Sequence, residues 1–305
     1  MSVRLAYAVA TLVIVIWGTT FISTKVLLNT LSPVEIMICR YILGYLSLWM
    51  LHPKWHRPES LREELIFLVA GFFGGTLYFL TENFALKYSL ASNVGLLVAS
   101  APILTALAAK MLLKGERLGR GVVFGFIVAF TGIFLVIFNG HFVLKLNPLG
   151  DMLAVAAAAS WALYSILIKN MPARHGGIHL TRKIFFYSLL TMSPLLFTDS
   201  VHWDMARLQS WPVIANLLFL GILASAGCFL LWSMVIWKLG PVRANNFMYM
   251  VPLVTMLTSV IVLQEPLTIF AIIGGLLILA GVYLASSGDW LLHRLRLKPA
   301  TKEHL

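Results

Sequence analysis

Apolar residues occur along this chain in runs of about 20, and short polar segments containing Pro, Gly and Asn separate the runs. An α-helix needs about 20 apolar residues to cross a bilayer, whereas a transmembrane barrel shows shorter segments of alternating polarity. The pattern therefore predicts an all-α integral membrane protein. Its ten expected spans lie at about residues 5–27, 33–51, 64–84, 91–113, 119–139, 148–170, 180–199, 211–237, 242–263 and 267–287.

Composition supports a membrane protein, since 60% of the residues are hydrophobic, 11% are charged and the mean hydropathy is +0.89. Soluble domains contain about 45–50% apolar and about 25% charged residues. The first apolar run, which follows Arg4, is longer than the ~7–15 residues of a signal-peptide core. We therefore expect this run to be a retained first span.

The net charge of +11 does not indicate a nucleic-acid partner, because the positive charges lie mostly in alternate loops between the runs. With the N-terminus inside, 18 of the 23 Lys and Arg residues fall on the inner side, three on the outer side and two within spans. Cytoplasmic loops are rich in Lys and Arg, so we expect both termini in the cytoplasm, with a basic tail at 289–305. Cys39 and Cys228 lie in apolar runs without metal-type spacing, which disfavours a disulfide framework or a zinc site.

The two halves of the chain repeat each other. The matches are WGTTFISTK (17–25) with WALYSILIK (161–169), APILT (101–105) with VPLVT (251–255), and Gly125 and Gly132 with Gly274 and Gly281. Each half has five expected spans, an odd number, so the second half enters the membrane from the opposite side. The sequence thus predicts two inverted repeats, at 1–140 and 147–288, and such repeats place a substrate site near the midplane between them.

These repeats resemble those of the EamA-type transporters, which belong to the drug/metabolite transporter superfamily. The shared features are a Trp-bearing first helix, a Pro in the fourth helix, a turn that ends in Glu and a Gly-rich fifth helix, and they extend over about residues 5–287. The resemblance implies a ten-helix basket with a central cavity and the export of amino acids or other small metabolites. It leaves the substrate open, because the substrates of the family are diverse.

One face of the first helix in each half carries aromatic and hydroxyl side chains. Trp17, Thr20 and Phe21 lie at i, i+3 and i+4, and Trp161 and Tyr164 repeat the pattern. Such a stripe suits the wall of a cavity for an organic solute. It suits helix packing with an interfacial Trp belt equally well.

Three charged residues, Lys25, Arg40 and Glu82, lie within the expected spans at a similar depth near the outer side. Charges inside a membrane usually face the interior of the bundle and pair with one another. We expect these three to cluster as an outer gate or as the outer wall of the site, with Tyr78 one turn from Glu82 on the same face. The alternative is a structural salt bridge, with Lys25 snorkelling to the interface.

The other polar candidates lie on the fourth and ninth helices, which the family resemblance assigns to the central cavity. They are Asn93, Asn245, Asn246 and Tyr249. Asn93 is also explained as a helix-capping residue.

Two prolines and one tryptophan complete the candidates. Pro102 and Pro252 are expected to kink the fourth and ninth helices, and we consider them candidate hinges. Trp232 is the counterpart of Glu82 at an offset of 150 residues and is included as a cavity candidate.

The sequence favours a secondary transporter that exports an amino acid or a related solute, with aromatic solutes favoured by the Trp and Tyr residues, across a bacterial plasma membrane. Among carriers, the alternative is an exchanger of anionic metabolites such as nucleotide sugars, which Arg40 and Lys25 would serve. A membrane enzyme needs clustered metal ligands or a nucleophile beside a base, and neither is visible in the sequence. A channel or receptor is disfavoured because no rings of pore charges accompany the inverted repeat.

We expect no cofactor, and the expected partners are a small-molecule substrate and membrane lipid. Monomer and homodimer both stay open. All eight histidines lie in or beside loops, so the sequence does not choose between proton coupling, exchange and facilitated diffusion.

Overall fold

The structure is a computed structural model that describes residues 1–53, 60–89, 91–113, 120–138, 148–171, 176–198, 208–263 and 269–296. Every regular element in these ranges is a helix, so the all-α prediction is confirmed for the described part of the chain. Among the described residues, five helical stretches are long and apolar enough to cross a membrane. They are Val3–Leu27, Pro33–Leu51, Leu61–Tyr88, Pro148–Asn170 and Trp211–Leu239.

The helices follow the expected ranges closely. The first half contains α1 (Val3–Leu27), α2 (Pro33–Leu51), α3 (Leu61–Gly71), η1 (Phe72–Leu77), α4 (Tyr78–Tyr88), α5 (Ala91–Val98), α6 (Ala101–Leu112) and α7 (Arg120–Phe138). The second half contains α8 (Pro148–Asn170), α9 (Gly176–Met192), η3 (Ser193–Phe197), α11 (Trp211–Leu218), η4 (Phe219–Gly227), α12 (Cys228–Leu239), α13 (Pro241–Asn245), η5 (Asn246–Met250), α14 (Val251–Leu263) and α15 (Ile269–Arg296).

Some helices are longer than the expected spans, because polar residues extend them beyond the apolar run. The helix expected at 267–287 extends to Arg296, and the one expected at 64–84 runs from Leu61 to Tyr88. Hydropathy marks only the apolar part of a helix, so polar turns at its ends are missed. The start of α2 is well defined, because Ser32 and Glu35 form a capping box: the Glu35 N–H donates to Ser32 Oγ at 3.2 Å, and the Ser32 N–H donates to the Glu35 carboxylate at 2.7 Å.

Irregular backbone interrupts two matching pairs of expected spans. The segments η1 and η4 are π-helical and lie inside Leu61–Tyr88 and Trp211–Leu239. In the other pair, α5 ends at Val98 before α6 begins, and the 3₁₀ segment η5 precedes α14. Pro102 and Pro252 lie in the first turns of α6 and α14, where a proline needs no N–H partner. The α-helix is therefore interrupted just before each expected hinge proline.

The π-helical segments offer carbonyl groups to side chains on neighbouring helices. On η1, Phe73 O accepts a hydrogen bond from Ser160 Oγ at 2.7 Å, and Gly74 O accepts one from Tyr41 OH at 3.1 Å. On η4, Ala224 O accepts one from Trp17 Nε1 at 2.9 Å. A π-turn disturbs the regular ladder, and inside a membrane its carbonyls need protein donors. The bonds from Ser160 and Trp17 each connect one half of the chain with the other.

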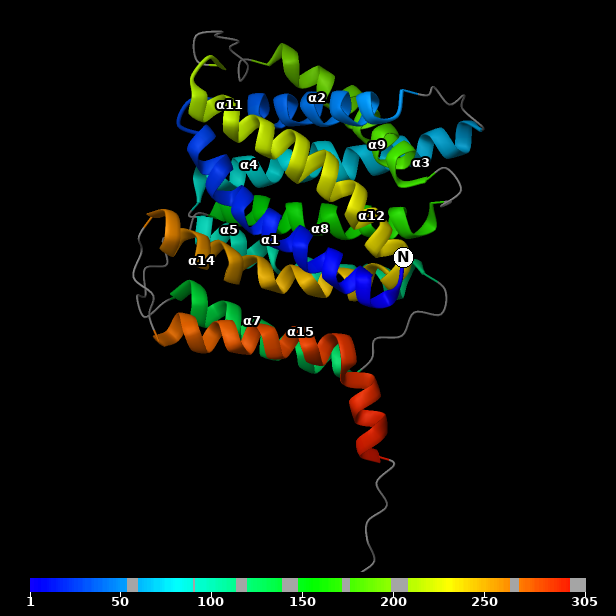
Figure 1. Cartoon of the computed structure of the whole chain (residues 1–305), viewed down its shortest axis with the longest axis vertical. Helices are drawn as coiled ribbons and strands as arrows, with labels where there is room; N and C mark the ends of the chain where they lie inside the picture. The colour runs from blue at the N-terminus through cyan, green and yellow to red at the C-terminus, as the bar shows by residue number, and fades with distance from the viewer. Residues whose placement is uncertain are drawn as a thin grey trace, which may run out of the picture.

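Helices α7 and α15 pack along each other and form a layer of their own at one edge of the bundle (Figure 1). Glycines bring their backbones together. A Cβ added at Gly132 would lie 2.5 Å from Gly274 O, and one added at Gly281 would lie 2.6 Å from Gly125 O. No side chain fits at such distances, so these positions need glycine. The four glycines that match between the halves thus contact one another reciprocally.

Helices α3 and α9 are joined at one end by an ion pair between Glu64 and Lys183. Tyr187 OH donates to the second carboxylate oxygen of Glu64 at 2.5 Å, and Lys183 Nζ lies 4.8 Å from the centre of the Phe67 ring. Both side chains of the ion pair are largely buried, and the pair connects a helix of the first half of the chain to a helix of the second half.

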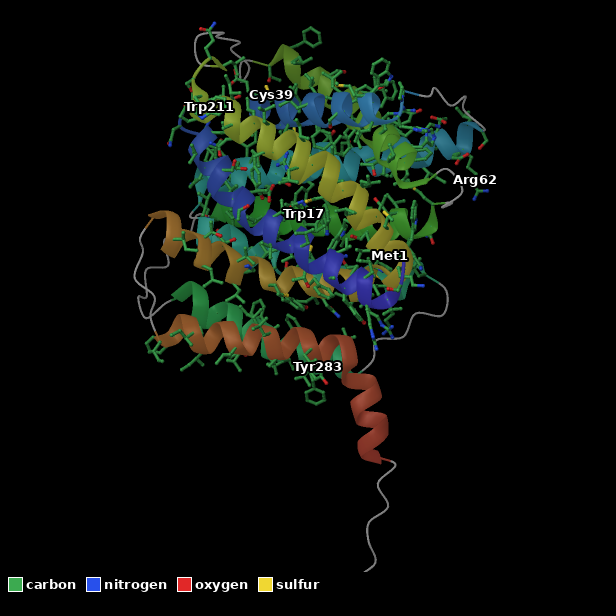
Figure 2. All side chains as sticks on the ribbon, in the orientation of Figure 1. Met1, Trp17, Cys39, Arg62, Trp211 and Tyr283 are labelled. Atoms are coloured by element: carbon green, nitrogen blue, oxygen red, sulfur yellow. The ribbon has the colours of Figure 1, made fainter. Side chains whose placement is uncertain are left out.

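Large apolar side chains lie both inside and outside the bundle. Trp17 is in the interior, whereas Trp211 and Tyr283 lie at the periphery and are 74% and 59% exposed (Figure 2). Extended exposed apolar surface is unusual for a soluble monomer and is expected of a surface that faces lipid.

Candidate functional site

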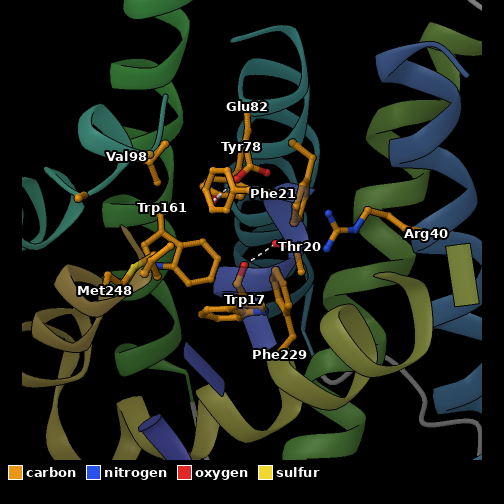
Figure 3. A pocket seen from close by; sticks show the side chains of 14 residues that line it. Trp17, Thr20, Phe21, Arg40, Tyr78, Glu82, Val98, Trp161, Phe229 and Met248 are labelled. Atoms are coloured by element: carbon orange, nitrogen blue, oxygen red, sulfur yellow. Dashed lines mark hydrogen bonds between the residues drawn. The ribbon is translucent and has the colours of Figure 1, made fainter. Parts of the chain in front are cut away.

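A cavity of about 30 Å³ lies between helices of both halves of the chain (Figure 3). This volume accommodates about two water molecules, so a metabolite needs the cavity to widen. The lining residues are Trp17, Thr20, Phe21, Arg40, Tyr78, Phe79, Glu82, Gly95, Val98, Ala99, Trp161, Phe229, Met248 and Val251.

Four aromatic rings, those of Trp17, Phe79, Trp161 and Phe229, form what we call the aromatic box. Trp17 and Trp161 meet edge to face with their ring centres 5.2 Å apart, and Phe229 lies 5.8 Å and 5.7 Å from them. Phe79 and Phe229 lie 6.2 Å apart. Each ring has its match in the other half, because Trp17 pairs with Trp161 in the repeat and Phe79 with Phe229. Such contacts stabilise by about 0.5–1.5 kcal/mol each beyond burial, so the rings hold one another in position.

Arg40, Tyr78 and Glu82 form a polar wall on one side of the box, and all three come from the first half of the chain. Arg40 is 2% exposed and Glu82 is 7% exposed. Tyr78 OH donates to Glu82 Oε1 at 3.0 Å, and the Arg40 guanidinium lies over the Phe79 ring, 4.0 Å from its centre. Figure 3 shows Arg40 and Glu82 reaching toward the same region from different helices.

The π-helical segment η4 supports both the polar wall and the box. Ser225 on η4 accepts a hydrogen bond from Arg40 Nε at 2.9 Å, and the neighbouring Ala224 carbonyl accepts the Trp17 indole N–H. Gly221 allows this approach, since a Cβ there would lie 2.6 Å from Leu43 Cβ on α2. π-turns occur often at functional sites, and this one positions side chains of α1 and α2.

Asn245 fixes the position of the Trp161 ring through a hydrogen bond. Its Oδ1 accepts the Trp161 indole N–H at 2.8 Å, and its Nδ2 donates to Ser165 Oγ at 2.9 Å and to Thr105 Oγ1 at 3.1 Å. Asn245 is fully buried and does not line the cavity. The structure thus places it as a support for the box.

Lys25 lies apart from the polar wall. Its Nζ donates to the Leu86 carbonyl at 2.6 Å, and the residue is exposed. Lys25 is in the last turn of α1, and its side chain contacts the last turn of α4. The structure therefore brings two of the three expected charges to one cavity and leaves the third outside it.

The other predicted cavity residues occupy different places. Thr20, Phe21 and Tyr78 line the cavity, as the stripe on α1 and the face of α4 predict. Four residues are buried but do not line it: Tyr164, Trp232, Asn246 and Tyr249. The side chain of Asn93 lies outside the described residues.

The interrupted helices contribute a further wall. Gly95, Val98 and Ala99 come from the end of α5 and the break after it, and Met248 and Val251 come from η5 and the start of α14. Val98 and Met248 match at the 150-residue offset. The candidate hinge prolines therefore lie next to cavity-lining backbone.

Several of these lining residues were not predicted. Phe79 and Phe229 belong to no polar motif, but the 150-residue offset that pairs Glu82 with Trp232 also pairs these two phenylalanines, and that pattern identifies both. Ser225 is found only through its contact with Arg40, because no sequence pattern reveals a π-helical segment.

The groups that line the cavity are suited to binding a ligand. The cavity presents one guanidinium, one carboxylate, two hydroxyls and six aromatic rings. Among the described residues, no group of three or more His, Cys, Asp or Glu side chains is placed to hold a metal ion. Such a cavity suits a small organic molecule with charged and apolar parts.

Helices of two matching halves around a central cavity are the architecture of a membrane carrier. The EamA-like transporter family matches residues 4–138 and 148–287 of this chain. The chain therefore belongs to the EamA-like transporter family, and it is an integral membrane protein. The family predicted from the sequence is confirmed.

Similar proteins are also transporters by name. An uncharacterized transporter of Archaeoglobus fulgidus is 28% identical over 284 residues, covering 90% of this chain and 95% of that protein. A probable amino-acid metabolite efflux pump of Salmonella typhimurium is 26% identical, covering 90% and 92%. A probable terminal-alkyne amino-acid exporter of Streptantibioticus cattleyicolor is 26% identical, covering 90% of each chain. A crystal structure with 20% identity superposes with a TM-score of 0.72 over 92% of this chain and 98% of the other, which supports the fold.

Proposed function

We propose that this protein is a secondary transporter that exports an amino acid or a related small metabolite by alternating access. It has ten transmembrane helices in two inverted repeats, 1–140 and 147–288. Both termini and the basic tail at 289–305 are in the cytoplasm, and the protein resides in a bacterial plasma membrane.

The observation that carries this proposal is the composition of the cavity wall. Both halves of the chain contribute, in matched pairs such as Trp17 with Trp161 and Val98 with Met248. A site between two inverted repeats becomes accessible to opposite sides of a membrane when one repeat rocks against the other. The interruptions before Pro102 and Pro252 provide backbone that such a movement can bend.

The charges in the cavity support an amino acid over an anion. A nucleotide sugar carries several negative charges, and it would meet the Glu82 carboxylate beside Arg40. Lys25, the second cation that an anion exchanger would use, lies outside the cavity. The two relatives named as exporters of amino acids or their metabolites agree with this preference.

Counterflow in proteoliposomes tests the proposal. Vesicles loaded with a pool of unlabelled amino acids and related metabolites are diluted into labelled ones, with and without a pH gradient. We expect transient accumulation of at least one amino-acid-type solute. The matched control is Trp211→Ala, at an exposed peripheral position, which should transport like the wild type, whereas Trp161→Ala should not. Failure of every solute to accumulate under every gradient contradicts a carrier.

The topology has its own test. Membrane-impermeant maleimide applied to intact cells should label a cysteine introduced at Lys145 and leave one at Arg57 unlabelled, in a background where Cys39 and Cys228 are replaced. Labelling of both positions, or of Arg57→Cys alone, contradicts the proposed orientation.

A further inference from the structure

We infer that Arg40 and Glu82 recognise the two ends of a zwitterion, so that the cavity selects free α-amino acids with an apolar or aromatic side chain. Arg40 binds the carboxylate, Glu82 binds the ammonium group, and the side chain enters the aromatic box. This inference rests on the proposed function and specifies the chemical class of its substrate.

Arg40 has unused hydrogen-bonding capacity that faces the cavity. A guanidinium carries five N–H donors, and in Arg40 only Nε–H is bonded, to Ser225 Oγ at 2.9 Å. The two terminal nitrogens have no hydrogen-bond partner among the described residues, yet they are not sealed from the cavity. These nitrogens form the planar fork that binds a carboxylate through two parallel hydrogen bonds.

Glu82 likewise has one carboxylate oxygen with a hydrogen-bond donor and one without. Its Oε1 accepts the Tyr78 hydroxyl at 3.0 Å, while Oε2 has no donor among the described residues and is open to the cavity. A carboxylate that already accepts one hydrogen bond has capacity for an ammonium group, whose three donors are compact and rotatable.

The two charged groups line the same cavity, but they do not contact each other directly. Arg40 and Glu82 interact electrostatically, although they form no ion pair. Phe79 below the guanidinium, Ser225 at its Nε and Tyr78 at the carboxylate hold each group in its own position. A cation and an anion in an apolar interior would otherwise be expected to meet. The space between Arg40 and Glu82 therefore suits a ligand whose carboxylate lies toward Arg40 and whose ammonium group lies toward Glu82.

Charge balance explains why a zwitterion is favoured over a simple acid or amine. The pair of Arg40 and Glu82 is neutral in total, and a zwitterion leaves the occupied cavity neutral. A ligand with a single charge leaves one protein charge unpaired and adds net charge to a low-dielectric interior, which is costly.

The position of the box sets the orientation of the ligand. The counterpart of Glu82 is Trp232, so the corresponding place in the second half is apolar and fully buried. Only one side of the box is charged. The amino and carboxyl groups thus lie beside α2 and α4, and the side chain points toward Trp161, Phe229 and Met248. Met248 is flexible and suits side chains of different shape.

Analogues that lack one charge provide the experiment. The probes are L-phenylalanine and L-leucine, their amides, which lack the carboxylate, and their N-acetyl derivatives, which lack the ammonium group. Binding to the purified protein is measured as the ligand-dependent rise of the unfolding temperature, with the free amino acids and all analogues compared at the same pH and the series repeated at neutral and mildly alkaline pH. We expect each single-charge analogue to bind about 10- to 100-fold more weakly than the free amino acid, the loss typical of a charge-assisted hydrogen bond.

Two variants separate a role in recognition from a purely structural one. Arg40→Gln should lose discrimination against the amides and keep it against the N-acetyl derivatives, and Glu82→Gln should show the reverse. Lys25→Gln removes a cation outside the cavity and is the control. It should leave unchanged the affinity for the free amino acid relative to the amide and relative to the N-acetyl derivative. A variant that does not fold leaves the wild-type series as a sufficient test.

The outcomes distinguish this inference from the proposed function. Equal binding of free amino acids and both analogues by the wild type overturns the inference, and so does counterflow of a solute with one charge or none. In both cases the carrier assignment stands. The inference is supported if Arg40→Gln loses discrimination only against the amides and Glu82→Gln loses it only against the N-acetyl derivatives. Absence of binding and of counterflow for every solute overturns the inference together with the proposed function.

Discussion

Replacement of Arg40 and Glu82 together should destabilise the protein less than the two single replacements would add up to. Each residue is almost fully buried, and the two opposite charges line the same cavity and influence each other electrostatically. Arg40→Gln leaves a buried carboxylate without a counter-charge, and Glu82→Gln leaves a buried guanidinium in the same state. The double variant removes both charges, so its cavity is again neutral.

The geometry limits the size of this coupling. Two unit charges 4 Å apart interact by about 4 kcal/mol at an effective dielectric constant of ~20. Because the charged atoms of Arg40 and Glu82 lie more than 4.0 Å apart, this value is an upper limit. We expect a coupling free energy of about 1–3 kcal/mol, the range found for neighbouring interacting residues.

A double-mutant cycle measures the coupling. The free energy of unfolding is determined by reversible SDS titration for the wild type, both single variants and the double variant. The parallel cycle with Lys25→Gln and Glu82→Gln serves as the control, since Lys25 bonds to the Leu86 carbonyl instead. Strict additivity of Arg40→Gln and Glu82→Gln, or equal coupling in the control cycle, would refute the argument that the two cavity charges stabilise each other.

Three further perturbations test the packing around the cavity. Trp161→Phe removes the bond to the Asn245 amide and should reduce transport about 10-fold, consistent with loss of one buried hydrogen bond, while Trp211→Phe should transport normally in the same counterflow assay. Gly132→Val inserts a side chain where the α7 and α15 backbones touch and should lower the free energy of unfolding by about 1–3 kcal/mol or prevent folding; wild-type stability would contradict the glycine contact. Glu64→Gln weakens the ion pair with Lys183 and should cost about 1 kcal/mol in the same titration, whereas no loss would mean that this pair contributes nothing to the α3–α9 contact.

The helical content and the family were predictable because both depend on patterns that are local or duplicated. A run of about 20 apolar residues has few alternatives to a helix in a membrane, since its backbone groups must bond within the segment. The matched glycines illustrate the second case: Gly125 and Gly132 were paired with Gly274 and Gly281 by offset, and the structure brings the same four residues into contact.

The details of the cavity depend on contacts between distant helices, which hydropathy does not describe. The sequence predicts that Arg40 clusters with other charges, but its hydrogen-bond partner Ser225 lies 185 residues away, on a π-helical segment whose register is set by tertiary packing. Lys25 appeared at the right depth and still lies outside the cavity, because depth along a helix says nothing about the direction of a side chain. Phe79 and Phe229 carry no polar signature, so only the repeat reveals them.

The central claim is that a small metabolite crosses the membrane through the cavity bounded by Trp17 and Trp161. The most direct measurement is amino-acid counterflow by the wild type and by Ala99→Phe, in which a new ring fills the cavity at a position that is 2% exposed. Val123→Phe, at a 48% exposed position on α7, adds the same ring outside the cavity and is the matched control. We predict counterflow by the wild type and by Val123→Phe and none by folded Ala99→Phe. Undiminished counterflow by Ala99→Phe would contradict the account.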